Sequence, residues 1–393
     1  MAWNEMSSRE RLLTAMSCGQ PDRVPLHFRL FGFVPPEHFR WSDEFEAFQR
    51  WACIGVDDIL NLGAPSDMHP DVRVRSWREA PTADEPYPLL CKEYDTPAGV
   101  LRHVVREAGD SFNCGVAWQA DEVHLFDDYN VPRAKEHAVT SPEDLPKLRY
   151  LLAEPTAEHL KEFRDRAARV RRFATDNGVL VSGWGSAAVD AVVWLCGVQG
   201  SVLAAVDTPG FFEELLEILN AWDKRNCQML LDEGVDVLVR RGWYEGTHFW
   251  SPELVRRFFV PGVSELVAMA HQADAKFAWT MSAGIMPLLE TFKKIGLDVL
   301  YHVDPVQGGA DLSVVKQQLD GHVAVLGGIN SAITLGRGSR DEIRQAVFGA
   351  VDILAPGGGL ILSPVDCLFP DTPWESVETV VQAWREVCAC GAG

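Results

Sequence analysis

The chain has 393 residues, of which 47% are hydrophobic, and its formal net charge at pH 7 is -20. This length and apolar content allow one large α/β domain or two smaller domains with buried cores. The excess of acidic side chains disfavours two kinds of partner, namely the phosphate backbone of a nucleic acid and the anionic surface of a membrane.

No stretch of about 18 consecutive apolar residues is evident, so no transmembrane helix is predicted. The first residues, MAWNEMSSRERLL, carry acidic side chains and lack an apolar core, unlike a secretory signal. The nine cysteines are scattered along the chain without a regular spacing. Such cysteine usage is typical of a reducing compartment, so a cytoplasmic protein is predicted.

The first third of the chain predicts two short strands and one irregular stretch. VPLHFRL alternates apolar and polar residues and predicts a strand that ends near Arg29, and a second strand is predicted over residues 56–60. Between about 65 and 140 the pattern is less regular, but residues 89–94 and 100–106 predict a β-hairpin. We interpret residues 65–140 as an insertion within a single domain that spans residues 1–393.

From Ser141 onward, strands and helices alternate regularly. Strands are predicted at residues 179–185, 235–239, 276–280, 299–303, 323–326 and 360–362, and helices near residues 156–177, 190–206, 209–233, 286–294, 312–319, 340–354 and 373–387. Strands separated by helices of roughly 10 to 20 residues indicate a parallel sheet. With the two N-terminal strands there are about eight, so the predicted fold is an α/β protein with a closed (β/α)8 TIM barrel and an N-terminal β-hairpin excursion.

The segment VDVLVRRGWYEGTHFWSP, residues 235–252, predicts the centre of an active site. It consists of a short apolar strand, then charged and aromatic residues, and then Ser251-Pro252-Glu253 at the start of the next helix. Charged and aromatic side chains crowded between a strand and a helix are costly for folding alone. Binding residues commonly lie on such loops, which a rigid scaffold holds in place.

In a TIM barrel the reacting groups lie at the C-terminal ends of the strands, which defines the candidate site residues. The candidates for catalysis are Arg241, Tyr244, Glu245, His302 and Asp304. The candidates for substrate binding are Arg29, Trp184, Arg240, Trp243, His248, Ser282 and Asn330, and the candidate metal ligand is Cys367.

Several of these residues have structural roles as alternatives. Arg240 and Arg241 could bind a substrate carboxylate or close the barrel rim by pairing with acids, and strand alternation favours Arg241 as the inward one. His302 and Asp304 are two positions apart, which predicts a catalytic, metal-binding or structural pair on one side of the strand. Cys367 could be a metal ligand, a nucleophile or a small buried apolar residue.

Five segments together carry a resemblance to a known family. They are residues 20–25 (QPDRVP), residues 234–236 leading to 250–252 (GVD to WSP), residues 296–299 (GLDV), residues 326–330 (LGGIN) and residues 355–363 (APGGGLILS). In this order the chain resembles the uroporphyrinogen decarboxylase-like superfamily over nearly its whole length. It is closer to the branch of corrinoid-dependent and coenzyme M methyltransferases than to the haem-pathway decarboxylase. The resemblance implies a small-molecule substrate, a corrinoid protein as methyl donor and a homodimer.

Two departures from the family bear on the reaction. The methyltransferases carry His-x-Cys-Gly after the strand that here reads FAWTM, and this motif binds zinc together with a cysteine near the C-terminus. Here residues 280–283 read TMSA, and only Cys367 matches. Because a hydroxyl is a poor zinc ligand, zinc and no metal are left as alternatives. The decarboxylase carries Arg-Gln-Ala-Gly-Arg in its first loop, whereas residues 29–33 keep only Arg29, which disfavours a porphyrinogen substrate.

Three hypotheses of function follow. The first is methyl transfer, in which Arg241 anchors an anionic group, Tyr244 and Glu245 orient or protonate the substrate, and His302 with Asp304 acts as the acid–base pair. The alternative is a metal-free decarboxylase or lyase that acts on a small carboxylate. The third is a barrel that binds a ligand without catalysis; the lost His-x-Cys motif favours it, and the retained polar residues oppose it.

Overall fold

The computed structural model describes residues 5–107 and 119–390. The chain divides into two compact units, each of which is described by itself. The barrel unit contains residues 1–64, 164–185 and 227–393, and the hairpin unit contains residues 65–163 and 186–226. The predicted insertion at residues 65–140 lies within the hairpin unit, which also includes residues from the regular part of the chain. The prediction of a single domain over the whole chain stays a prediction.

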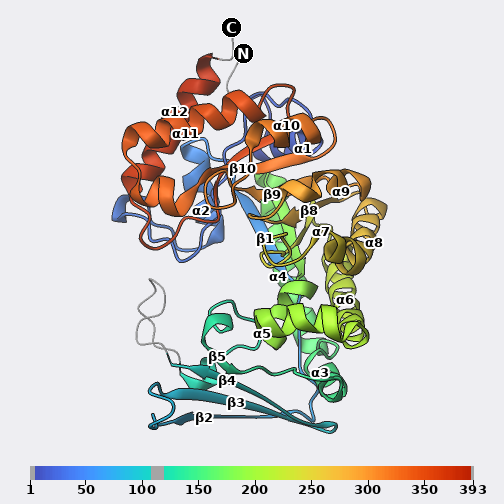
Figure 1. Ribbon diagram of the computed structural model, residues 1–393. Coiled ribbons are helices and arrows are strands. Elements are labelled where there is room, and N and C mark those ends of the chain that lie inside the picture. The colour runs from blue at the N-terminus through green and yellow to red at the C-terminus, as the bar shows by residue number, and fades with distance from the viewer. Residues whose placement is uncertain (1–4, 108–118, 391–393) are drawn as a thin grey trace. The chain divides into compact units, whose positions relative to one another are not determined.

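Seven parallel strands form the sheet of the barrel unit, in the order β1-β6-β7-β8-β9-β10-β11. The strands are β1 (Ile59–Gly63), β6 (Leu180–Ser186), β7 (Val237–Arg240), β8 (Lys276–Thr280), β9 (Val299–Val303), β10 (Ala324–Asn330) and β11 (Leu360–Val365). From β6 to β11, neighbours in the sheet are consecutive strands in the sequence with helices between them, as the alternating pattern predicts, whereas the four strands of the hairpin unit lie between β1 and β6 in the chain (Figure 1). The fold class is confirmed as a TIM-barrel-like α/β fold.

The segment around Leu26 occupies the position of the eighth strand. The backbone N–H of His27 donates to the carbonyl of Leu362 on β11, and the N–H of Leu362 donates to the carbonyl of Pro25, both at 2.9 Å. On the other side, the N–H of Asp57 donates to the carbonyl of Leu26 at 2.7 Å. The predicted first strand is therefore reduced to two isolated parallel bridges, Leu26 with Leu362 and Leu30 with Leu368, and the segment links β11 to the residues that precede β1.

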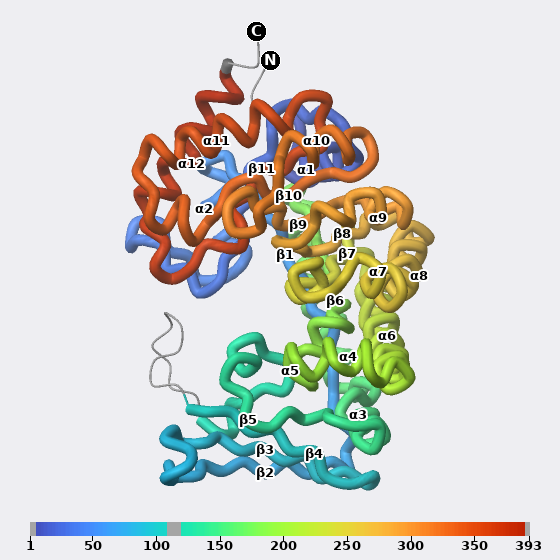
Figure 2. Tube along the Cα trace, viewed as in Figure 1, coloured from blue at the N-terminus to red at the C-terminus, as the bar shows by residue number. Residues whose placement is uncertain are grey.

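The barrel interior is filled by alternate strand residues and closed by the first helix. Val237, Val239, Ala278, Val299, Tyr301, Ala324 and Leu326 pack in one core cluster with Leu12, Ala15 and Met16 of α1 (Ser8–Met16). Helix α1 begins with a capping box in which Ser7 accepts from the N–H of Glu10 and the Glu10 carboxylate accepts from the N–H of Ser7. Figure 2 shows α1 beside β10 and β11, although more than 300 residues separate them in the chain.

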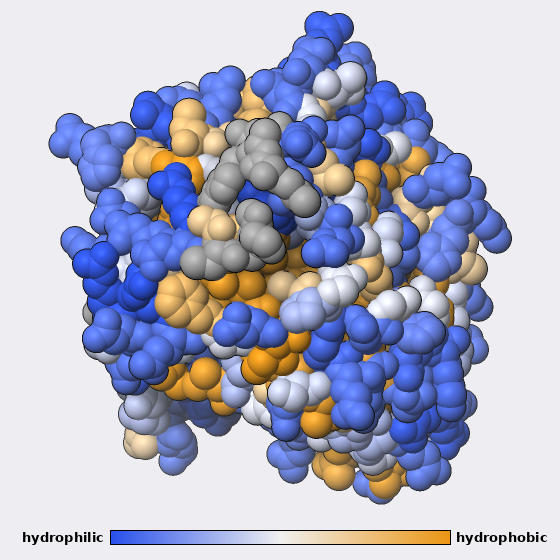
Figure 3. Space-filling model, turned by 90° about the horizontal axis from the view of Figure 1, so that it is seen from above, coloured by the Kyte–Doolittle hydropathy of each residue, from blue (hydrophilic) through white to orange (hydrophobic). Residues whose placement is uncertain are grey.

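The helices of the barrel unit surround the sheet at nearly the predicted positions. They are α2 (Glu44–Cys53), α7 (Pro252–Leu254), α8 (Val260–Gln272), α9 (Leu289–Lys294), α10 (Leu312–Leu319), α11 (Arg340–Leu354) and α12 (Trp374–Cys390), with π-helical turns at Val255–Phe259 and Ser331–Leu335. Helices α4 (Ala157–Asn177) and α6 (Pro209–Asp232) contain residues of both units. The face seen in Figure 3 is largely hydrophilic with smaller hydrophobic areas, in keeping with the net charge of -20.

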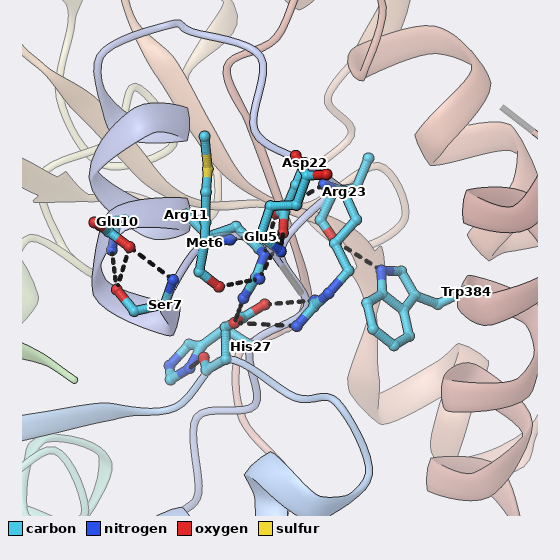
Figure 4. Close-up of polar contacts among 11 residues, drawn as sticks. Glu5, Met6, Ser7, Glu10, Arg11, Asp22, Arg23, His27 and Trp384 are labelled. Carbon is cyan, nitrogen blue, oxygen red and sulfur yellow. Dashed lines mark hydrogen bonds and ion pairs between the residues drawn. The ribbon is translucent and has the colours of Figure 1, made fainter. Parts of the chain in front are cut away.

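A buried ion-pair network anchors the segment that closes the barrel (Figure 4). The Arg11 guanidinium donates to Asp22 at 2.6 and 2.9 Å and to Asp57 at 2.6 Å, and Arg23 donates to Asp57 at 2.9 Å. All four side chains are at most 7% exposed. The Trp384 indole N–H donates to the carbonyl of Val24 at 2.8 Å. The network joins Asp22 and Arg23, which precede the bridge at Leu26, to Asp57, whose N–H donates to Leu26.

The hairpin unit is built on a four-stranded antiparallel sheet in the order β2-β3-β4-β5. Its strands are β2 (Arg73–Glu79), β3 (Leu89–Thr96), β4 (Gly99–Arg106) and β5 (Ala134–Glu136), and its helices include α3 (Leu145–Leu151) and α5 (Ala188–Asp207). The predicted hairpin of β3 and β4 is confirmed. At its turn, Gly99 has a φ of +122° and the Thr96 hydroxyl donates to the Gly99 carbonyl at 2.7 Å.

Among the described residues, helix α5 is long and apolar enough to cross a membrane by length and composition alone, with 20 residues and a mean hydropathy of 1.7 in its best window. It contains Asp190 and Gln199, so the expectation that no run of about 18 consecutive apolar residues occurs is not contradicted. Moreover, 67% of that window is buried inside the protein. The apolar side chains of α5 therefore supply core of the hairpin unit.

Candidate active site

A cavity of about 750 Å³ lies in the barrel unit and is lined by residues at or near the ends of its strands. The lining comes from residues 27–30, residues 41–44 and 47, residues 58–63 around β1, two residues each of β6 and β9, and one residue of β10. Three of the predicted site residues line it, namely Arg29, Trp184 and His302. A cavity at the C-terminal ends of barrel strands is where this fold places its substrates.

Arg29 is the cation of the cavity. Its guanidinium lies over the rings of Trp184 and Trp243, at 4.7 and 5.5 Å from the ring centroids, and 27% of its side chain is exposed. The Asn61 side-chain carbonyl accepts from the indole N–H of Trp184 at 3.0 Å and thereby orients that ring. The two hydrogen bonds of Arg29, to Asp366 at 3.2 Å and Cys367 at 3.4 Å, both use Nη1. Nε and Nη2 therefore remain for a bidentate anion.

Asp58 is one of three acidic residues that line the cavity; of the other two, Asp43 caps α2 and Glu44 accepts from Arg166. Asp58 precedes β1, and its carboxylate is 3.9 Å from Nδ1 of His27. Burial raises the pKa of Asp58 to about 7, against one backbone hydrogen bond from Ile59 that lowers it. Burial also lowers the pKa of His27 to about 4, so His27 is a neutral neighbour. Asp58 is thus a carboxyl group that exchanges its proton near neutral pH.

His302 contributes a neutral imidazole to the cavity. Burial and the nearby Arg29 charge lower its pKa well below 6.5. Its ring centroid is 4.9 Å from that of Trp243. His302 adopts a φ of +71°, the left-handed region that a non-glycine residue enters only at a cost. Because this conformation breaks the alternation of β9, Tyr301 and His302 both line the cavity.

Among the described residues the structure does not join His302 and Asp304 by a hydrogen bond, and the catalytic roles predicted for them stay predictions. The Asp304 carboxylate accepts instead from the N–H of Val306 at 2.8 Å and from the Asn330 amide at 2.9 Å, and it is 3% exposed. The Asn330 side chain in turn caps the next turn by accepting from Ile333 and Thr334. Asp304 and Asn330 therefore brace the loops after β9 and β10 beside the cavity, and neither lines it.

The structure pairs Arg240 with Glu245, as in the alternative in which an arginine closes the barrel rim by pairing with an acid, and the substrate-binding and proton-transfer roles predicted for them stay predictions. Arg240 donates to the two oxygens of Glu245 at 3.0 and 2.7 Å, and the indole N–H of Trp279 donates to Glu245 at 2.5 Å. Arg240 and Glu245 are at most 1% exposed. The Trp279 ring contacts Phe292 of α9 at 5.6 Å, so this group faces the helix layer. The Arg240–Glu245 pair therefore holds the loop after β7 on the side that faces the helices.

The other predicted residues lie on that loop or beside it. Arg241 shares the strand alternation of the inward residues Val237 and Val239, as predicted, but it does not line the cavity. The Tyr244 ring contacts Phe249 at 5.6 Å, and His248 is exposed. Ser282 follows β8 and is partly buried. The roles predicted for these residues stay predictions.

The residues around Cys367 do not fit a metal centre. Cys367 is 2% exposed, and its sulfur lies 3.4 Å from the Arg29 guanidinium and 3.5 Å from Asp366. Burial raises the pKa of its thiol, which disfavours the thiolate that zinc requires. Across residues 5–107 and 119–390, no three histidine, cysteine or acidic side chains are grouped to hold an ion. A guanidinium beside the sulfur would also oppose a cation.

Sequence reasoning missed three cavity residues, Asp58, His27 and Tyr301. Asp58 had a signal, because Asp57-Asp58 places two acids directly before an apolar strand. The carboxylate of Asp57 accepts hydrogen bonds from Arg11 and Arg23, whereas Asp58 lines the cavity. His27 and Tyr301 had no such signal, because each lies within a segment whose sequence is typical of an ordinary strand.

The structure is a TIM-barrel-like α/β fold with a polar cavity near its strand ends, which is where enzymes of this fold bind their substrates. Comparison with known families identifies the family. Residues 122–387 match the family model described as uroporphyrinogen decarboxylase (URO-D), which is more than half of the chain. The chain belongs to the URO-D family. No curated protein sequence matches it.

One of the compared solved structures supports the fold. The structure resembles a methyltransferase from Methanosarcina mazei with a TM-score of 0.58 at 15% sequence identity, covering 98% of this chain and 99% of that one. It matches a dihydropteroate synthase from Anaplasma phagocytophilum more weakly, with a TM-score of 0.31 at 13% identity over 44% of this chain and 69% of that one. At such identity the first likeness shows the fold alone.

Proposed function

We propose that this URO-D family protein is an enzyme that removes a carboxyl group from a small molecule without a zinc–thiolate centre. The observation that carries the proposal is the composition of the cavity, in which Arg29 and Asp58 are both lining residues. One is a cation with two donor nitrogens available, and the other is a carboxyl group whose pKa is raised to about 7. An anchor for a carboxylate and a proton donor are the groups that decarboxylation needs.

In the proposed reaction Arg29 binds the substrate carboxylate through Nε and Nη2, and the two tryptophan rings hold the guanidinium in place. The bond between the carboxylate and its carbon breaks, carbon dioxide leaves, and the electron pair stays on that carbon. The proton of the Asp58 carboxyl group then moves to the carbon, and Asp58 regains a proton from solvent. Because His27 and His302 are neutral, neither places a positive charge near Asp58 that would favour the loss of its proton.

Methyl transfer is the second candidate, and the likeness to the Methanosarcina mazei methyltransferase over 98% of the chain favours it. In this case a corrinoid protein would be the methyl donor, and the anion on Arg29 would belong to the acceptor. The donor set around Cys367 argues against zinc activation of that acceptor. For either reaction we propose a cytoplasmic location and a homodimer, and the free thiols of the described cysteines agree with the first.

A product assay distinguishes the two reactions. Protein treated with a chelator is incubated with a panel of small aromatic and aliphatic carboxylates, and carbon dioxide is measured. In parallel, methylcobalamin is added with thiol acceptors, and loss of the methyl–cobalt absorbance is followed. Carbon dioxide release that Arg29→Met abolishes and Arg40→Met, at an exposed arginine, leaves intact supports decarboxylation. Demethylation of methylcobalamin without carbon dioxide release supports methyl transfer and overturns the proposal.

A further inference from the structure

Among the described residues, three buried polar atoms of β8 and β9 have no hydrogen-bond partner, two of them on residues that line the cavity and the third on the neighbouring strand. They are the hydroxyl of Tyr301, Nδ1 of His302 and the hydroxyl of Thr280. All three residues are at least 96% buried, since Tyr301 is 4%, His302 1% and Thr280 0% exposed. A buried polar group without a hydrogen bond costs about 1–3 kcal/mol, so three of them close together call for a ligand.

The strands place these groups side by side. Thr280 of β8 pairs in register with Tyr301 of β9, so their side chains project to the same face of the sheet. Tyr301 belongs to the barrel core and also lines the cavity, where Leu326 of β10 is its neighbour in register. His302 follows directly and reaches the same cavity because of its positive φ.

The surroundings of these groups decide which chemistry they accept. Tyr301 is held among aliphatic side chains such as Val299 and Leu326. Burial raises the pKa of Tyr301 and lowers that of His302, so a phenol and a neutral imidazole face the cavity. A hydroxyl donor beside a neutral ring nitrogen matches an uncharged oxygen, and Arg29, the cation that lines the same cavity, takes the substrate carboxylate in the proposed reaction.

We infer that Tyr301, His302 and Thr280 form a second subsite, which binds an uncharged oxygen of the substrate: a hydroxyl, ether or carbonyl group. The inference rests on the proposed function for the other end of the substrate, where Arg29 takes the carboxylate. The substrate class is therefore a carboxylate that carries a second, neutral oxygen function. The Tyr301 hydroxyl donates to that oxygen, and His302 accepts from it when it is a hydroxyl.

The test uses three probes and isothermal titration calorimetry. Benzoate, 4-hydroxybenzoate and phenol are titrated into wild type, Tyr301→Phe, Arg29→Met and the control Tyr94→Phe, at a buried tyrosine of the hairpin unit. In the wild type, 4-hydroxybenzoate should bind about tenfold more tightly than benzoate. Tyr301→Phe should reduce this ratio to about one and weaken phenol, with no change in the affinity for benzoate. Tyr94→Phe should behave as the wild type.

Phenol separates this inference from the proposed function. Phenol binding that survives Arg29→Met and weakens in Tyr301→Phe supports the second subsite, even if neither carboxylate binds and the role of Arg29 falls. Equal affinity of wild type and Tyr301→Phe for phenol overturns the inference, whatever the carboxylates do. Absence of phenol binding to the wild type also overturns it.

Discussion

Replacing Asp58 by asparagine should change how the stability of the protein depends on pH. The pKa of Asp58 is raised from 3.8 to about 7 by burial, and its side chain is 16% exposed. A difference of about 3 units corresponds to about 4 kcal/mol, as an upper estimate. The folded state holds this proton up to about pH 7, whereas the unfolded chain loses it near the ordinary value.

The sign follows from this difference in bound protons. The stabilisation by protonated Asp58 is fully present below pH 3.8 and is lost as the pH rises to about 7. Asparagine has no proton to lose. The free energy of unfolding of Asp58→Asn, relative to the wild type, should therefore rise by up to about 4 kcal/mol from about pH 4 to about pH 8 and then level off.

His27 acts in the opposite direction. Its pKa is lowered to about 4, so its contribution is present above 6.5 and is lost as the pH falls toward about 4. In the wild type the pH-dependent contributions of Asp58 and His27 to the free energy of unfolding partly cancel. In Asp58→Asn only the contribution of His27 remains of these two, so the free energy of unfolding of this variant should rise with pH between about 4 and 6.5.

Urea denaturation followed by tryptophan fluorescence at several pH values measures these quantities. Asp352→Asn, at an exposed carboxylate on α11, is the matched control and should show a flat difference. A difference between Asp58→Asn and wild type that does not vary with pH would refute the reasoning about the cavity.

Three further outcomes are expected. Arg29→Met should lower kcat/KM on the order of 100-fold in a steady-state assay, because the substrate carboxylate loses its bidentate partner; an unchanged value would exclude Arg29 as the anchor. Arg11→Met should reduce the free energy of unfolding by about 3–5 kcal/mol in denaturant titrations, because it leaves Asp22 and Asp57 buried beside too little positive charge. Cys367 should resist alkylation by iodoacetamide near pH 8 while exposed Cys53 reacts, since burial raises the thiol pKa of Cys367; mass spectrometry of tryptic peptides would show the opposite order if Cys367 were an activated ligand or nucleophile.

The elements of the barrel could be predicted from sequence because their boundaries are chemically sharp. The strands Lys276–Thr280 and Val299–Val303 and the helix Arg340–Leu354 match the predicted residues. Each strand is a short apolar run between glycine or polar residues, and the helix begins with Ser339 and a capping box. The eighth strand was harder to predict, because two isolated bridges, at Leu26 and Leu30, replace a full ladder.

The site was predicted less well, for reasons of backbone geometry. The His302–Asp304 pair rested on regular alternation, which fails where His302 adopts a positive φ and the pairing of β9 with β10 shifts between Leu326 and Gly327. The role of Glu245 rested on its place in a polar loop, but that loop folds back so that Arg240 takes its carboxylate. Neither the positive φ of His302 nor the path of the loop that holds Glu245 can be read from the spacing of residues in the sequence.

The pH dependence of carbon dioxide release tests the central claim most directly. The claim is that protonated Asp58 delivers the proton in a cavity where Arg29 holds the carboxylate. We predict that kcat/KM of the chelator-treated wild type falls about tenfold per pH unit above about pH 7 and that Asp58→Asn loses both the activity and this limb of the profile. A profile that rises with pH through this range, as expected for a thiolate or a general base, would contradict the account.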